Sequence, residues 1–131
     1  MITEDYVSFE VAKLLKENGF DGYCVQIYDS DKYLSRNLCG YINEEKANEF
    51  FSALAPTHQM AMKWLREEHK IFIYIEPFIT TSGLQGYKPY CTKIGGEFMW
   101  INPLRKYSNT SSDTYEEAVE AALKYSLEKL I

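Results

Sequence analysis

Three side chains near the middle of the chain carry groups that enzymes use for proton transfer and nucleophilic attack. Glu68 and His69 are adjacent at the end of an expected helix, and Cys91 lies in an expected strand. A thiol beside an oriented imidazole can act as a nucleophile, and a desolvated carboxylate can act as an acid. Cys91 with His69 is therefore a candidate catalytic pair, and Glu68 with His69 is a candidate polar site. We favour the simpler interpretation, in which the cysteine packs in the core and the helix end lies in solvent.

Metal and cofactor motifs are not present in the sequence. Zinc ligands would have to come from Cys24, Cys39, Cys91, His58 and His69, and no CxxC or HxxxH pair brings any two of them together. There is no P-loop, no GxGxxG, no HExxH and no GxSxG. We therefore expect no metal, no cofactor and no catalytic residue.

The composition is that of one folded domain. The chain has 131 residues, of which 46% are hydrophobic and 25% charged, and this length can bury a sizeable core. No run approaches the roughly 20 apolar residues of a membrane span, and the first residues lack the basic segment of a signal peptide. Three cysteines form an odd set that suits reduced thiols. We expect a single domain over residues 1–131, a cytoplasmic location and no membrane contact.

Three helices are predicted from apolar spacing and capping residues. The first runs over 8–18, with Ser8 as N-cap and Gly19 as terminator. The second begins near Pro56 and Thr57 and places Met60, Ala61, Trp64 and Leu65 on one face. The third begins at Thr114, which forms a capping box with Glu117, and its inward residues are Val119, Ala122, Leu123, Leu127 and Leu130.

Alternating residues predict strands over 23–28, 33–37, 71–76, 87–94 and 97–101. Pro77 is expected to end the pairing of its strand, and Gly95 with Gly96 is expected to form a hairpin turn. In that hairpin register Tyr90 shares a face with Thr92 and Ile94, and Cys91 shares the opposite face with Phe98 and Trp100. Residues 43–54 fit a helical turn or an ordered loop equally well. The order α-β-β-α-β-β-β-α predicts an α+β domain with a mainly antiparallel sheet packed by three helices.

Three segments together carry a resemblance to a known group of proteins. They are YVSFEVAKLLKENGFD, APTHQMAMKWLREEHKIFIYI and TYEEAVEAALKYSLEKLI. In this order they resemble a family of small uncharacterised proteins of gut Bacteroidetes and their prophages or mobile elements. One position departs from the family pattern, which has an apolar residue where this chain has Glu68. The resemblance implies a compact bacterial accessory protein of phage or mobile-element origin, with no activity to carry over.

The strongest functional signal is the aromatic content, 15% of the chain. Phe72 and Tyr74 alternate with isoleucines, and we group them with Phe98 and Trp100 as a partner-binding sheet face that three helices need not cover. The expected function is a non-catalytic interaction module that binds a protein partner or a second copy of itself. The competing interpretation is that a helix covers these aromatic side chains too and they belong to the core.

Nucleic-acid binding is the alternative function. Residues 55–108 carry seven Lys or Arg and four Asp or Glu, together with several tyrosines. A basic sheet with stacking aromatic rings can hold a single strand. The net charge of −5 for the whole chain disfavours this interpretation.

Overall fold

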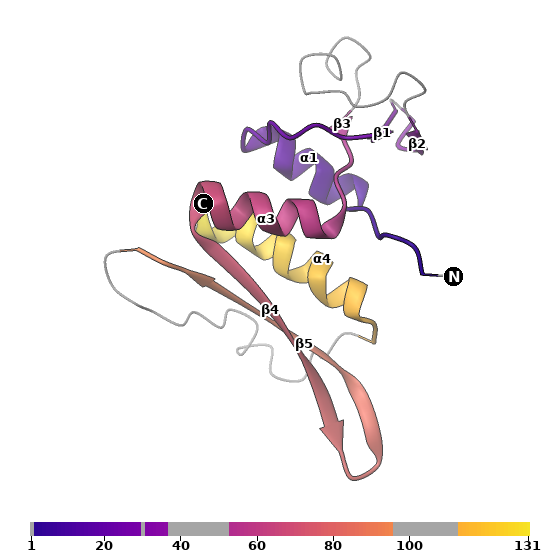
Figure 1. Ribbon diagram of the computed structural model, residues 1–131, viewed down its shortest axis with the longest axis vertical. Coiled ribbons are helices and arrows are strands. Elements are labelled where there is room, and N and C mark those ends of the chain that lie inside the picture. Colours follow the sequence, from indigo (N-terminus) through magenta and orange to yellow (C-terminus); the bar gives the residue numbers. More distant parts are fainter. Residues whose placement is uncertain (1, 30, 37–52, 96–112) are drawn as a thin grey trace. The chain divides into compact units, whose positions relative to one another are not determined.

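The computed structural model describes residues 2–29, 31–36, 53–95 and 113–131. The chain divides into two compact units, Met1–Trp64 and Leu65–Ile131, and the boundary falls within helix α3 (His58–His69). Each unit has a sheet of its own (Figure 1). In the first, β1 (Gln26–Tyr28) lies between β2 (Leu34–Arg36) and β3 (Ala53–Leu54), and in the second, β4 (Ile71–Thr80) pairs with β5 (Gly83–Lys93). The expected α+β class, with three helices and antiparallel strands, is confirmed for the described residues, although the strands form two small sheets and not one. The prediction of a single domain stays a prediction.

Helix α1 (Phe9–Glu17) begins and ends with the caps that its sequence predicts. The Ser8 hydroxyl accepts a hydrogen bond from a first-turn backbone amide at 3.2 Å, which satisfies a donor that the helix itself cannot. Beyond the helix, Gly19 has a φ of +84°, and the Phe20 amide donates to the Leu15 carbonyl at 2.9 Å. This is a Schellman cap, which requires the positive φ that glycine adopts at little cost.

Strand β1 (Gln26–Tyr28) is the centre of the first sheet. It pairs antiparallel with β2 (Leu34–Arg36) on one side and with β3 (Ala53–Leu54) on the other. The turn between β1 and β2 is closed by the Asp29 carboxylate, which accepts hydrogen bonds from two backbone amides at 2.9 and 3.0 Å. Of the segment 43–54, whose structure the sequence left open, only Ala53–Leu54 is described, and it is a strand.

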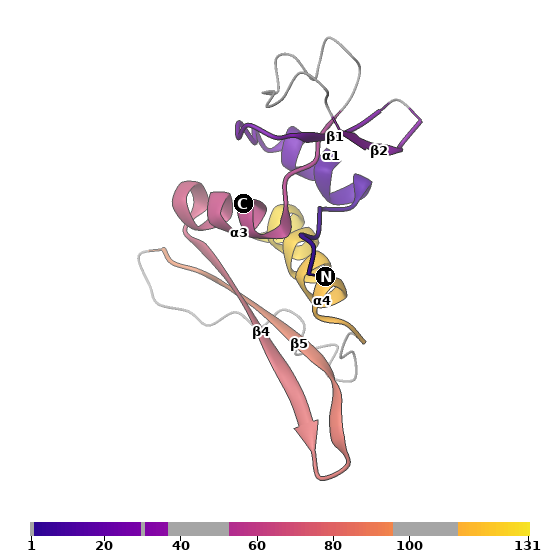
Figure 2. The ribbon, with the colours of Figure 1, turned by 45° about the vertical axis from the view of Figure 1, so that its right-hand side comes forward.

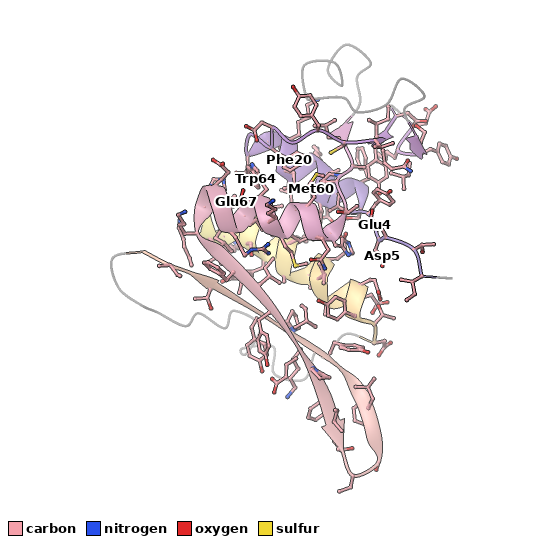
Figure 3. The ribbon with its side chains drawn as sticks, in the orientation of Figure 1. Glu4, Asp5, Phe20, Met60, Trp64 and Glu67 are labelled. Carbon is pink, nitrogen blue, oxygen red and sulfur yellow. The ribbon has the colours of Figure 1, made fainter. Side chains whose placement is uncertain are left out.

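Aromatic contacts hold the core of the first unit together. The Tyr28 hydroxyl donates to the Val7 carbonyl at 2.6 Å, and the Tyr28 ring lies edge-on to Phe9 at 5.6 Å. Phe20 and Trp64 make a second edge-on contact at 5.6 Å (Figure 3). Such pairs contribute beyond the apolar area that they bury.

Helix α3 (His58–His69) begins at a point where the backbone of Asp5 contacts it. The Thr57 hydroxyl accepts from a first-turn amide at 3.1 Å, and the His58 amide donates to the Asp5 carbonyl at 2.9 Å. One part of the predicted inward face is wrong, because Met60 is exposed and Met62 is buried. The buried stripe follows the i, i+3, i+4, i+7 spacing from His58, which includes Met62 and leaves Met60 at its margin.

The second unit is built on a long hairpin of β4 (Ile71–Thr80) and β5 (Gly83–Lys93). Lys70 alone joins α3 to β4, and its φ of +56° reverses the chain. The expectation that Pro77 ends the pairing is wrong, since Pro77 pairs with Tyr87 and the ladder continues to Thr80. The expected turn at Gly95–Gly96 and the strand at 97–101 lie outside the described residues, apart from Gly95.

Helix α4 (Tyr115–Tyr125) continues into a π-helical turn, η2 (Ser126–Leu130). The Thr114 hydroxyl accepts from the Glu117 amide at 3.1 Å, as the capping box predicts. The predicted inward residues Val119, Ala122, Leu123, Leu127 and Leu130 are all buried. Figures 1 and 2 show α4 along one face of the hairpin, whose turn extends beyond the start of the helix.

Candidate functional site: the outer face of the β4–β5 hairpin

The register of the hairpin separates its side chains into two faces. Cross-strand partners share a face, and successive residues alternate between faces. We define the outer face by Phe72, Tyr74, Glu76 and Phe78 of β4 with their partners Thr92, Tyr90, Lys88 and Gly86 of β5. We define the inner face by Ile71, Ile73, Ile75 and Pro77 of β4 with their partners Lys93, Cys91, Pro89 and Tyr87 of β5.

Helix α4 packs on the inner face from the level of Tyr87 to that of Lys93, while Pro77 stays exposed. Tyr115, at the start of the helix, contacts the ring of Tyr87 edge-on at 5.9 Å. At the other end, Lys93 Nζ donates to the carbonyl of Leu130 at 2.7 Å. The two segments between these contacts have similar lengths. The strand from Tyr87 to Lys93 spans roughly 20 Å, and the helix from Tyr115 to Leu130 spans roughly 22 Å. The inner face is therefore the core side of the hairpin.

The outer face is an ordered row of contacting aromatic and charged groups. The rings of Tyr74 and Tyr90 lie 5.5 Å apart across the strands, and the Tyr90 hydroxyl donates to Glu76 Oε2 at 2.7 Å. Further along, Lys88 Nζ lies 4.1 Å from the centre of the Phe78 ring. These contacts restrict the side-chain rotamers, so a binding partner would meet a surface that is already arranged.

Large apolar side chains on this face remain in contact with solvent. Phe72 is 40% exposed, Tyr74 is 53% exposed and Phe78 is 37% exposed. Isolated exposed apolar residues are ordinary on protein surfaces, whereas three aromatic residues in line along one strand form a patch. The competing interpretation of Phe72 and Tyr74 as core residues is thus wrong for the described structure.

The predicted partner-binding face is only partly described. Phe72 and Tyr74 lie on the outer face, while Phe98 and Trp100 lie outside the described residues. The sequence had grouped Phe98 and Trp100 with Cys91, and Cys91 belongs to the inner face because it pairs with Ile73.

Cys91 is a core residue and does not have the properties of a nucleophile. Its side chain is fully buried, and its Sγ donates to the Ala122 carbonyl at 3.6 Å. Burial raises the pKa of the Cys91 thiol to about 11, and the neighbouring Ser126 side chain opposes this shift. A thiol with this pKa holds its proton at neutral pH, so the candidate pair of Cys91 and His69 lacks the thiolate that the chemistry requires.

Glu68 and His69 close helix α3, as predicted. The Glu68 side chain is exposed, so its carboxylate is not desolvated, and His69 is half-buried. A desolvated acid at Glu68 therefore has no structural basis.

The second described cysteine is also a core residue. Cys24 is buried in the first unit, and burial raises the pKa of its thiol to about 12. Among residues 2–29, 31–36, 53–95 and 113–131, no group of three or more His, Cys, Asp and Glu side chains is placed to hold a metal ion. Cys39 lies outside these ranges.

The basic residues of the nucleic-acid interpretation are dispersed over the described structure. Lys70 Nζ donates to the Glu67 carbonyl at 3.2 Å, and Lys93 is on the inner face. Lys88 is the one lysine or arginine that the described hairpin places on its outer face, beside the acidic Glu76. Arg105, Lys106 and Tyr107 are not described.

The sequence analysis identified two of the eight residues of the outer face, Phe72 and Tyr74. Phe78 was excluded because Pro77 was expected to end the strand, and Tyr90 was assigned to a different face from Tyr74. The correct register could have been inferred from two residue pairs, Tyr74 with Tyr90 and Glu76 with Lys88. Aromatic pairs and pairs of opposite charge are typical cross-strand neighbours.

Comparison with protein-family models, with curated proteins and with solved structures gives no match. Within the described part of the chain, no helix has the length and apolar character needed to cross a membrane.

Proposed function

We propose that this protein is a non-catalytic interaction module that binds a protein partner through the outer face of the β4–β5 hairpin. One observation carries the proposal. Phe72, Tyr74 and Phe78 are each exposed by more than a third on one face of a two-stranded ribbon, while α4 packs on the other face. Aromatic residues in a preformed row supply large contact areas at a small entropy cost, as protein interfaces require.

The chemistry of the described cysteines supports a function without catalysis. Both described thiols are buried and have raised pKa values, and the candidate acid Glu68 is exposed. The phage or mobile-element origin implied by the sequence resemblance is compatible with a small binding protein and adds nothing about its partner.

Site-specific photo-crosslinking tests the proposal. A photoreactive phenylalanine analogue is placed at Tyr74, and a second variant carries it at Tyr33, which is exposed but lies in the first unit. Irradiation in cells that produce the chain should yield a protein adduct from position 74 and none from position 33. Absence of any protein adduct at position 74, in a chain whose circular dichroism melting curve is unchanged, would contradict the proposal.

A polar substitution gives a second readout. Tyr74→Ser with Phe72→Ser should abolish the adduct formed from a probe at Phe78, whereas Tyr33→Ser should leave it unchanged. Binding of a single-stranded oligonucleotide, measured at low and at physiological salt, distinguishes the alternative function, because phosphate contacts weaken steeply as salt rises.

A further inference from the structure

We infer that the partner of the outer face is a second copy of this chain, packed face to face about a two-fold axis that runs along the hairpin. This inference rests on the proposed function and names the occupant of the surface. It follows from the edges of the hairpin and from the arrangement of charge on its outer face.

The edges of the hairpin are poorly suited to adding another strand. Cross-strand pairs in an antiparallel ladder alternate between hydrogen-bonded and non-hydrogen-bonded, and the Ile94 amide donates to the Lys70 carbonyl at 2.9 Å. Counting from that bonded pair, Pro77 and Pro89 both occupy non-hydrogen-bonded positions, where an amide would point outward. Proline has no amide hydrogen, so each edge lacks a donor there. Packing through the outer face is favoured over pairing through an edge.

The two rows of the outer face differ in charge. The β4 row is Phe72, Tyr74, Glu76 and Phe78, and the β5 row is Thr92, Tyr90, Lys88 and Gly86. The acidic residue is in one row and the basic residue is directly opposite in the other. Aromatic residues end the β4 row, whereas Thr92 and Gly86, which end the β5 row, are buried within the chain. Each row is thus complementary to the other in charge.

A two-fold axis along the ribbon brings unlike rows together. In a face-to-face pair with this symmetry, the β4 row of one copy lies over the β5 row of the other at the same level. Glu76 of each copy then meets Lys88 of the other. A two-fold axis perpendicular to the strands, crossing the ribbon at the level of Glu76, would instead bring Glu76 of one copy against Glu76 of the other. Repulsion between the two like charges disfavours that arrangement.

The charge of the whole chain is consistent with contact at this face. A net charge of −5 opposes self-association of exposed surfaces. The outer face carries one acid and one base, and the segment 77–87, PFITTSGLQGY, carries no charged residue. The face measures roughly 20 Å by roughly 10 Å, so the pair would bury less than about 1,200 Å² and belong to the weak, transient class of interfaces.

Charge reversal in trans tests the inference. Glu76→Lys alone places two lysines in contact, and Lys88→Glu alone places two glutamates in contact, so each variant should associate about tenfold or more weakly than the unmodified chain. An equimolar mixture of the two variants restores both unlike contacts and should associate within about threefold of the unmodified chain. The double variant Glu76→Lys with Lys88→Glu should recover as well. Sedimentation equilibrium from about 10 µM to about 1 mM measures these constants.

Matched controls separate this contact from net charge and from folding. Glu128→Lys and Lys129→Glu make the same charge changes at exposed positions of η2, and both should associate as the unmodified chain does. Melting temperatures show whether each variant is folded. Recovery on mixing requires an intermolecular contact, since a pair within one chain cannot be repaired by another copy.

Three results would overturn the inference. The unmodified chain could stay monomeric up to about 1 mM, the folded single variants could associate unchanged, or their mixture could fail to recover. If a photoadduct at Tyr74 then contains a different protein, the proposed function stands and only the self-association is wrong. If no protein adduct forms at Tyr74, the proposed function fails as well.

Discussion

Tyr90 donates a hydrogen bond to Glu76 across the β4–β5 hairpin, with 2.7 Å between Oη and Oε2. The two residues are not direct cross-strand partners, because Tyr90 pairs with Tyr74 and Glu76 pairs with Lys88. The diagonal bond therefore connects two successive pairs of the outer face. It holds the Tyr90 ring against Tyr74, where the ring centres are 5.5 Å apart.

A double-mutant cycle measures the energy of this diagonal bond. Tyr90→Phe and Glu76→Ala should each lower the free energy of unfolding, and the coupling between them should be about 0.5–1.5 kcal/mol, because the acceptor carboxylate is only half-buried. Urea denaturation of the four chains, carried out at a concentration where the unmodified chain is monomeric, provides the values. A coupling near zero would show that the bond adds nothing in solution.

The stability of the protein should fall at alkaline pH because of Cys91. Burial raises the pKa of this thiol from 9.0 to about 11. The unfolded chain loses the proton near pH 9 and the folded chain near pH 11, so the folded state binds more protons between these values. The stabilisation is complete below pH 9, declines as pH rises and is lost above pH 11, with a total of about 2–3 kcal/mol.

Comparison with Cys91→Ala isolates this effect from the titration of the tyrosines. The variant should be less stable at pH 7 because it leaves a cavity, yet its free energy of unfolding should decline less steeply above pH 9. If the free energy of unfolding declined equally with pH in the two chains, the raised pKa of the Cys91 thiol would be contradicted. In the native state, a thiol reagent should modify Cys91 and Cys24 slowly, and urea should remove their protection.

Ser126→Ala should stabilise the protein. The Ser126 hydroxyl is fully buried and makes no hydrogen bond to the described residues while the Cys91 thiol is neutral. An unsatisfied buried hydroxyl costs about 1–3 kcal/mol, so its removal should raise the free energy of unfolding by about 0.5–2 kcal/mol. The hydroxyl can donate to a thiolate, which explains why it opposes the raised pKa of Cys91.

The matched substitution is Ser82→Ala in the exposed turn of the hairpin, which should change stability by less than about 0.5 kcal/mol. A loss of stability in Ser126→Ala would reveal a partner of the hydroxyl. If the variant folds, its Cys91 thiol should ionise at a higher pH than in the unmodified chain, as ultraviolet titration of the thiolate would show.

Gly19→Ala should destabilise the protein although there is room for the methyl group. Nothing lies within 4 Å of a Cβ at this position, but its φ is +84°. The left-handed conformation costs a non-glycine residue about 1 kcal/mol or more. Gly95→Ala is the control, since it is equally open and lacks a positive φ in this range. Thermal unfolding should show a lower midpoint for Gly19→Ala alone, and equal midpoints would mean that the Schellman cap relaxes.

Local signals allowed the helices to be predicted closely. Ser8, Gly19 and Thr114 act through residues within one or two turns, so their effect does not depend on distant parts of the chain. Predictions that depended on strand length were less accurate. Pro77 was expected to end a strand, whereas it continues one because its missing amide faces the edge of the hairpin.

The candidate site required the pairing register. The sequence places Phe72 and Tyr74 on one face of β4 by simple alternation, and this face is exposed. It does not show which residues of β5 lie opposite, because a register shift of one residue exchanges the faces. Only the register brings Tyr90 and Lys88 beside Tyr74 and Glu76.

The sequence alone determined the class of fold, the helix ends and the alternation of β4, since each depends on the short-range spacing and conformational preference of neighbouring residues. Tertiary structure decided that the strands form two sheets, that Cys91 is enclosed under α4 and that the outer face combines aromatic residues with one acid and one base. These features arise from contacts between segments far apart in the chain, which single-sequence periodicity does not encode.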